Sequence, residues 1–153
     1  MKIRLATKKD LNSLAKIYVE SFNNAKLEEE WTEKNAQRYM EYWLKIQPSL
    51  FFIAEDNKTI VGGIVARITP WWKENILGDI EIFISLKHQN KGIGKELLKK
   101  LISTAIEKYK IGEVALQAFS THKFPLKWYE KIGFKKIKWI NLSGNPKEII
   151  KKL

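Results

Sequence analysis

Two kinds of hydrophobic pattern alternate along this chain. Short apolar runs bounded by turn residues are typical of β-strands. They cover residues 2–6, 50–55, 59–68, 79–85, 113–118 and 134–142. Asp56, Asn57 and Lys58 form a suitable hairpin turn between two of these runs. Thr69 and Pro70 are expected to end the longer run, because proline is poorly placed in a strand.

Between the predicted strands, apolar residues recur at the three- and four-residue spacing of amphipathic helices. Thr7 and Thr32 are suited to cap the first two helices, and Pro48 closes the second one. The two later helices cover residues 93–106 and 123–131, each followed by a terminating glycine. Residues 148–153 remain ambiguous, although their apolar spacing fits a helical turn.

The order of these elements is β-α-α-β-β-β-α-β-α-β-β, without an internal repeat or a linker. We therefore expect an α/β (α+β) fold with one domain over residues 1–153. Its sheet would be mixed and mostly antiparallel, with six to seven strands and with helices on both faces. The long helix after residues 79–85 has the length of a crossover connection, which joins two parallel strands.

A polar turn with two glycines joins the strand at residues 79–85 to the long helix. Its sequence is Gln89-Asn90-Lys91-Gly92-Ile93-Gly94. A helix N-terminus presents unpaired backbone N–H groups and the positive end of the helix dipole, and glycine leaves the backbone open to a ligand. The turn therefore favours a phosphate or diphosphate group. The alternative is a well-capped connection that binds nothing.

Two motifs resemble those of the GCN5-related N-acetyltransferase (GNAT) family. Gln89, Gly92 and Gly94 match its acetyl-CoA signature, Gln/Arg-x-x-Gly-x-Gly/Ala. The segment Trp128-Tyr129-Glu130-Lys131-Ile132-Gly133-Phe134 is similar to a second family motif, an aromatic residue followed by Tyr-Glu-Lys-x-Gly-Phe. The resemblance covers nearly the whole chain. It implies the GNAT fold, with a final strand near residues 148–153.

The resemblance also implies an activity. The protein would transfer the acetyl group of acetyl-CoA to a primary amine, by direct attack in a ternary complex. The acceptor would be a small molecule, a peptide or a protein, and the sequence does not distinguish between them. The alternative function is a non-catalytic module that binds or senses acyl-CoA.

Family resemblance further implies how the chain would hold acetyl-CoA. The pantetheine arm would run along the central strand and use the backbone of Ile82, Phe83 and Ile84. His122 replaces an asparagine common in the family, and it either contacts the cofactor or caps the short helix. The diphosphate would bind to the turn and the helix start, which comprise Gln89, Asn90, Lys91, Gly92, Ile93, Gly94 and Lys95. For each lysine there, a solvated helix face is the alternative.

Glu81 is a carboxylate in the middle of an apolar strand. Burial of an unpartnered carboxylate is costly, so a lysine partner in an ion pair is one interpretation. The other is a general base, acting directly or through water, with a pKa raised by its surroundings. A third role is to position the ammonium group of the acceptor. Asp79, two residues earlier and expected on the same face, is the substitute if Glu81 is structural.

Tyr129 is the second catalytic candidate. By resemblance, its hydroxyl would donate a proton to the thiolate of coenzyme A as it leaves. The alternative is an ordinary core tyrosine packed beside Trp128 and Phe134.

Composition limits the remaining classes of function. The chain has 153 residues and a net charge of +11, from 28 basic and 17 acidic residues spread over its whole length. A scattered excess of this kind attracts anions, but it does not predict a nucleic-acid partner. The absence of cysteine and the presence of only two histidines predict no metal site and no disulfide.

Location and assembly are also expectations at this point. The chain has no long apolar run and no signal-peptide pattern, so we expect a soluble, cytoplasmic protein without a membrane partner. The resemblance implies a homodimer, which no residue pattern demonstrates. Trp31, Trp71 and Trp72 lie in connections that would face the acceptor, or would pack across a dimer interface.

Overall fold

A computed structural model describes residues 1–26, 29–120, 123–138 and 140–153. The chain forms two compact units, Met1–Gln117 and Ala118–Leu153, which we describe separately. His122, one of the predicted cofactor contacts, lies outside the described residues. The prediction of one domain over residues 1–153 stays a prediction.

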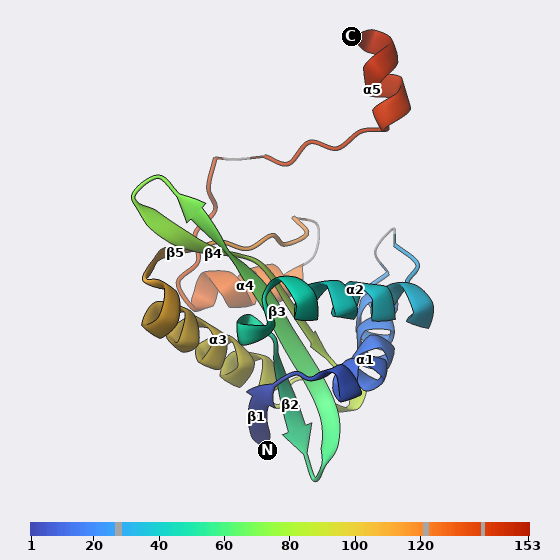
Figure 1. Ribbon diagram of the computed structural model, residues 1–153, viewed down its shortest axis with the longest axis vertical. Coiled ribbons are helices and arrows are strands. Elements are labelled where there is room, and N and C mark those ends of the chain that lie inside the picture. The colour runs from blue at the N-terminus through green and yellow to red at the C-terminus, as the bar shows by residue number, and fades with distance from the viewer. Residues whose placement is uncertain (27–28, 121–122, 139) are drawn as a thin grey trace. The chain divides into compact units, whose positions relative to one another are not determined.

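The first unit is built on a five-stranded sheet in the order β1-β2-β3-β4-β5 (Figure 1). The first four strands are antiparallel neighbours, and β4 pairs with β5 in parallel. The strands are β1 (Lys2–Leu5), β2 (Phe52–Asp56), β3 (Thr59–Trp71), β4 (Glu74–Ile84) and β5 (Ile111–Val114). The mixed, mostly antiparallel sheet was predicted, although the predicted number of strands was six to seven.

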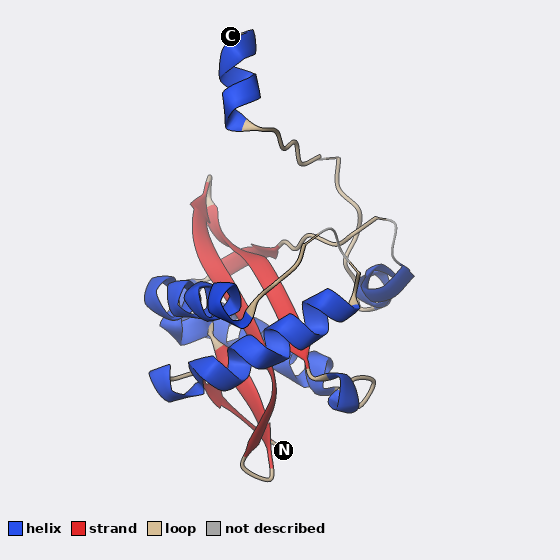
Figure 2. Ribbon diagram, turned by 90° about the vertical axis from the view of Figure 1, so that its right-hand side faces the viewer, coloured by secondary structure: helices blue, strands red, loops and turns tan. Residues whose placement is uncertain are grey.

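Helices cover both faces of this sheet (Figure 2). On one face, α1 (Leu11–Asn24) and α2 (Glu33–Ile46) pack over Ile53, Val65 and Phe83 and form the main core. On the other face lies α3 (Ile93–Tyr109), whose Lys100 lies over the ring of Phe52. Because successive residues of a strand point to opposite faces, Phe52 and Ile53 serve the two layers in turn. The described residues of this unit also form three short 3-10 helices: η1 (Lys8–Asp10), η2 (Pro48–Leu50) and η3 (Leu86–His88).

The pairing of β3 and β4 contains a β-bulge at Asp79. Val65 lies opposite Glu81, whereas Arg67 lies opposite Gly78. Two residues of β4, Asp79 and Ile80, therefore face one residue of β3. Asp79 has a φ of 50° and forms an ion pair with Arg67 at 2.5 Å. The bulge interrupts the alternation on which the expected shared face of Asp79 and Glu81 was based.

Two strand predictions were wrong for physical reasons. The strand at 59–68 does not end at Pro70, because β3 continues to Trp71 and Pro70 lies opposite Asn75. The pairing between β2 and β3 ends at Ile64, so the missing N–H of Pro70 deprives β2 of no hydrogen bond. In the described part of residues 134–142 there is no strand, because a run of strand-like composition becomes a strand only when it pairs with a neighbour.

Among its described residues, the second unit contains two helices. The first, α4 (Lys123–Lys131), has the predicted bounds and is followed by Gly133 at a φ of 110°. The second, α5 (Pro146–Lys152), begins after Asn145, whose side chain accepts a hydrogen bond from the N–H of Lys147. For the ambiguous C-terminal residues, the helical alternative is therefore the one observed. No helix in the described part of the chain is long and apolar enough to cross a membrane.

Candidate functional site

The turn between β4 and α3 has the backbone conformation that its glycine predicts. Gly92 precedes the first helical residue, Ile93, and has a φ of 81°. Residues with a side chain adopt this left-handed conformation reluctantly. A Cβ atom at Gly92 would have no heavy atom within 4 Å, so the space beside this residue is open. Glycine is therefore favoured here by the backbone conformation and not by crowding. The predicted start of the long helix is confirmed.

The side chains around this turn divide into structural and exposed groups. Gln89 donates a hydrogen bond from Nε2 to the carbonyl oxygen of Ile84 at 3.1 Å, which ties the turn to the end of β4. His88 Nδ1 lies 2.7 Å from Ser85 Oγ and also stabilises the turn. Lys91 and Lys95 are exposed. The turn therefore holds its shape through its own contacts, with two cationic side chains in solvent beside the start of α3.

Next to this turn, one edge of β4 has no paired strand among the described residues of the first unit. Ser85 donates its N–H to Val61 O at 2.9 Å, which marks a hydrogen-bonded pair of the antiparallel ladder. By alternation, the backbone groups of Phe83 point toward β3, and those of Ile82 and Ile84 point toward the other edge. On that edge the register with β5 extends from Asn75 to Leu77. Of the three predicted backbone contacts, Ile82 and Ile84 are the two that face this edge.

Glu81 receives a hydrogen bond on each of its carboxylate oxygens. Tyr18 on α1 donates to Oε2 at 2.8 Å, and Tyr39 on α2 donates to Oε1 at 2.5 Å. In the part of the chain that the structure describes, Glu81 has no salt bridge, so the alternative interpretation, an ion pair with a lysine, is not the arrangement observed. Two neutral hydroxyl groups, and not a cation, satisfy this carboxylate.

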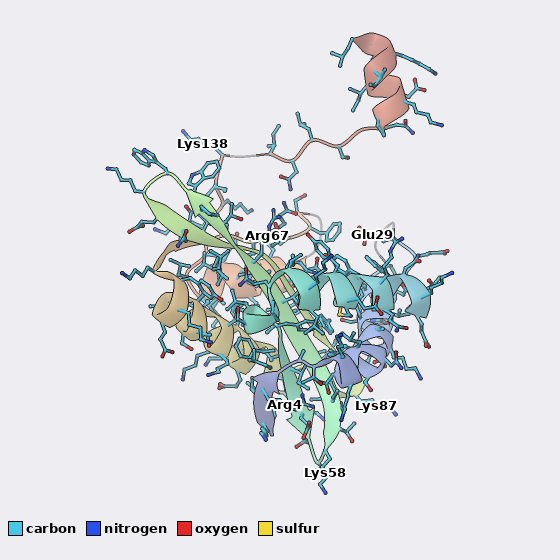
Figure 3. All side chains as sticks on the ribbon, in the orientation of Figure 1. Arg4, Glu29, Lys58, Arg67, Lys87 and Lys138 are labelled. Carbon is cyan, nitrogen blue, oxygen red and sulfur yellow. The ribbon has the colours of Figure 1, made fainter. Side chains whose placement is uncertain are left out.

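Burial and the two tyrosines act in opposite directions on Glu81. Burial is the largest effect and raises the pKa of its carboxyl group above the ordinary value, whereas the hydrogen bonds from Tyr39 and Tyr18 lower it. The negative charges of Glu29 and Asp79 raise it further. Figure 3 shows Glu29 in the connection between α1 and α2, and Arg67, the partner of Asp79, on β3. The net direction of the pKa shift is upward.

An aromatic cluster encloses the two tyrosines. The Tyr18 ring stacks on Phe22 at 4.2 Å between centroids and meets Trp31 edge-on at 4.9 Å. Trp31 is fixed in place because its backbone N–H and C=O groups both bond to the side chain of Asn23. Its indole Nε1 donates to Glu29 at 2.9 Å. Trp31 thus lies in the same cluster as Glu81's two partners.

The other two tryptophans singled out in the sequence lie elsewhere. Trp71 ends β3 and Trp72 is in the turn before β4, with Lys73 Nζ 4.6 Å from the centre of the Trp72 ring. Trp72 is 89% exposed. They occupy the far end of the β3–β4 hairpin, whereas the glycine turn follows the opposite end of β4.

The sequence analysis did not identify Tyr18 and Tyr39 as site residues, because both fit the apolar faces of amphipathic helices. A signal was present, because tyrosine at a buried helix position carries a hydroxyl group that needs a partner. Sequence alone does not identify the partner, which lies 63 residues from Tyr18 and 42 from Tyr39.

Tyr129 belongs to the second unit. Its ring lies 4.9 Å from that of Trp128 and 5.6 Å from that of Phe134, and only 7% of the residue is exposed. Burial raises the pKa of its phenol to about 12. At neutral pH the hydroxyl is therefore protonated, which is the state that a proton donor requires.

The described residues contain no group of three or more histidine, aspartate or glutamate side chains that could hold a metal ion.

Comparison with known proteins places this chain in a family. The model of the acetyltransferase (GNAT) family matches residues 11–134. The chain belongs to the GNAT family. An uncharacterized N-acetyltransferase from Archaeoglobus fulgidus is 29% identical over 112 residues, which are 71% of this chain and 76% of that protein.

One further relative and one solved structure resemble parts or all of the chain. N-alpha-acetyltransferase 30 from Xenopus laevis is 35% identical over 94 residues, or 61% of this chain. The match spans about a third of that relative's length, at 34%. A predicted acetyltransferase from Clostridium acetobutylicum, solved with acetyl-CoA, has the same fold, with a TM-score of 0.72 and 22% identity. That likeness covers 93% of this chain and 95% of the other.

Proposed function

We propose that this protein is an acetyl-CoA-dependent N-acetyltransferase that acetylates a primary amine by direct attack in a ternary complex. The observation that carries the proposal is the continuous segment from Glu81 to Lys95. It supplies a hydrogen-bonded carboxylate, an open strand edge and a glycine turn at a helix N-terminus, in that order. Membership of the GNAT family supports the same activity.

The residues of this segment fit the parts of acetyl-CoA. The turn at Gly92 leaves open space beside the backbone N–H groups that begin α3, which suits a diphosphate. Lys91 and Lys95 add positive charge. The edge N–H and C=O groups of Ile82 and the N–H of Ile84 suit the amides of a pantetheine arm, whereas the C=O of Ile84 already accepts a hydrogen bond from Gln89. The solved relative from Clostridium acetobutylicum contains acetyl-CoA. When bound here, the cofactor would supply the acetyl thioester.

Two side chains would handle the protons of the reaction. The amine nitrogen forms a bond to the acetyl carbon while the bond from that carbon to sulfur breaks. The ammonium form of the amine first loses a proton to solvent. When the neutral nitrogen attacks, it loses one further proton, which Glu81 accepts directly or through water, and the leaving sulfur gains one, which Tyr129 donates. Because burial raises the pKa of Glu81, its carboxylate is a stronger base than an exposed glutamate.

The acceptor is proposed only as a class. A primary amine that is cationic in solution would be drawn to Glu81 and Glu29, and a protein N-terminus is one such amine. The relative from Xenopus laevis is named as an N-alpha-acetyltransferase, which makes peptides with a free N-terminus the first acceptors to test. A cytoplasmic location and a homodimer stay predictions from the sequence.

The test is an acetyl-CoA-dependent thiol-release assay against peptides, polyamines, amino acids and aminoglycosides. We expect coenzyme A to appear together with an acetylated amine, identified by mass spectrometry. Tight binding of coenzyme A without thiol release for any acceptor would contradict the proposal and would favour a non-catalytic acyl-CoA-binding module.

A further inference from the structure

The Glu81 carboxylate is fixed by two hydrogen bonds, although a general base in an apolar pocket does not require them. Its two oxygens are bonded by hydroxyl groups from two different helices, at 2.8 Å from Tyr18 and 2.5 Å from Tyr39. Phenylalanine at either position would keep the ring contacts of the cluster. The hydroxyl groups therefore have a purpose beyond filling the core, since buried tyrosine hydroxyls are placed where they find a partner.

The two hydrogen bonds fix the Glu81 carboxylate and still leave it able to accept a proton or a further hydrogen bond. A carboxylate has about four acceptor sites on its two oxygens, so two remain after both tyrosines have donated. The plane of the group is set by two donors that come from two different helices, α1 and α2. The free acceptor sites consequently have a defined direction before any amine arrives.

The two tyrosines differ in their access to solvent. Tyr18 is 2% exposed and is enclosed by Phe22, Trp31 and Phe83, whereas Tyr39 is partly exposed. Tyr18 thus anchors the carboxylate from inside the core, and Tyr39 bonds it from the side nearer to solvent.

We propose that Tyr18 and Tyr39 are positioning residues, which orient the partly buried Glu81 carboxylate toward the acceptor amine and keep it ionised. This inference rests on the proposed function, because it assigns a purpose to the carboxylate of that same site. Neither Tyr18 nor Tyr39 lies in the two motifs that resemble those of the GNAT family.

The charges that face Glu81 make this role necessary. Glu29 from the connection after α1 and Asp79 from β4 both disfavour a negative charge on Glu81. Arg67 on β3 compensates Asp79 in an ion pair. Against burial and these two acids, the hydroxyl groups of Tyr18 on α1 and Tyr39 on α2 are the contacts that favour the ionised form.

The test compares Tyr39→Phe and Tyr18→Phe with Tyr42→Phe as the matched control. Tyr42 lies on α2, its ring stacks on that of Tyr39 at 6.2 Å, and within the described residues its hydroxyl makes no hydrogen bond. For each variant, kcat/KM is measured against pH with one acceptor. Loss of one hydroxyl should move the acidic limb about one pH unit upward. Tyr42→Phe should leave it in place.

A second measurement does not depend on activity. The Glu81 carboxyl carbon is titrated by NMR in the protein labelled with 13C-glutamate, and its signal is assigned by its absence from Glu81→Gln. Tyr39→Phe and Tyr18→Phe should each raise the midpoint by about one pH unit. If neither variant moves the midpoint, the proposal is wrong, even if both lower the turnover.

The two measurements also separate this inference from the proposed function. If no amine is acetylated by the unmodified protein but the midpoint moves as expected, the function fails and the two hydroxyl groups still control the ionisation of Glu81. If acetylation occurs and the acidic limb stays in place in both variants, the function stands and the positioning role is overturned.

Discussion

The turn before α3 and the cluster around Glu81 lie on one stretch of chain but are built in different ways. The turn consists of consecutive residues, and its principal feature is the left-handed backbone of Gly92. The cluster joins β4 to α1 and α2, so its parts meet only in the folded protein. A site made of backbone is local and readable in sequence, whereas a site made of side chains depends on packing.

The largest effect should come from a charge placed in the turn. Gly92→Asp adds a negative side chain beside the proposed diphosphate position, at a φ of 81°. We expect the Kd for coenzyme A to rise by at least about a hundredfold. Isothermal titration calorimetry provides the measurement.

Gly92→Ala is the matched control for this change. It introduces a left-handed strain of about 1 kcal/mol, which is at least as large as that of aspartate, without a charge. If the aspartate variant binds coenzyme A as tightly as the alanine variant, the turn is not the diphosphate site.

A change in the cluster should affect turnover and leave cofactor binding intact. Glu81→Gln keeps the size of the side chain but removes its charge, and we expect kcat to fall about a hundredfold. The affinity for coenzyme A should remain within about twofold, because the turn is a separate structure. Steady-state kinetics and calorimetry on the same preparation test both parts. Equal turnover in the variant would remove Glu81 from the catalytic assignment.

The buried carboxylate of Asp10 contrasts with Glu81, because its pKa is lowered, whereas that of Glu81 is raised. Asp10 accepts two hydrogen bonds from Arg4, each at 2.8 Å, and one from the N–H of Thr7. The Arg4 hydrogen bonds are the largest cause that lowers its pKa to about 2. Its contribution to the free energy of unfolding, about 2 kcal/mol, is present above the unfolded pKa of about 3.9 and is lost as the pH falls toward 2.

Urea unfolding between pH 7 and pH 2 measures this contribution. Asp10→Asn should lower stability at pH 7 and should flatten the loss between about pH 4 and pH 2. Glu81 should behave oppositely, because its pKa is raised in the folded state. Its contribution is full at low pH and declines as the pH rises above about 4.3. An unchanged acid transition in Asp10→Asn would show that the Arg4 pair has no net effect.

The smallest effect is expected at Tyr129. Tyr129→Phe removes the proposed proton donor but keeps the ring that packs against Trp128 and Phe134. We expect kcat to fall at least about tenfold. An assay with the acetyl thioester of a more acidic thiol would test whether proton donation explains this loss, since such a leaving group needs no proton donor. If the variant is equally impaired with both thiols, Tyr129 has another role.

The sequence predicted those parts of the fold and site that depend on neighbouring residues. The start of α3 after Gly92 and the bounds of α4 follow from local rules for helix ends. Gln89 was placed correctly in the turn, but its hydrogen bond to Ile84 O was not foreseen. This bond depends on which edge the carbonyl of Ile84 faces.

Other features depend on contacts between distant residues. Pro70 was expected to end β3, and only the early end of the β2 pairing at Ile64 explains why it does not. The partners of Glu81 were missed for the same reason, because Tyr18 and Tyr39 fit an apolar helix face as well as a carboxylate site. The role of Tyr129 stays a prediction.

The bulge at Asp79 determines where the chain tolerates changes of length. Because side chains in a strand alternate with a period of two, one residue inserted or deleted between Glu81 and Ile84, within β4, would reverse the side to which Glu81 points relative to the turn. The Trp72–Lys73 end of the hairpin lies before the bulge. A change in chain length there would leave the side to which Glu81 points unchanged. Variation in chain length is therefore expected at the hairpin end, while the spacing from Glu81 to Ile84 should stay constant.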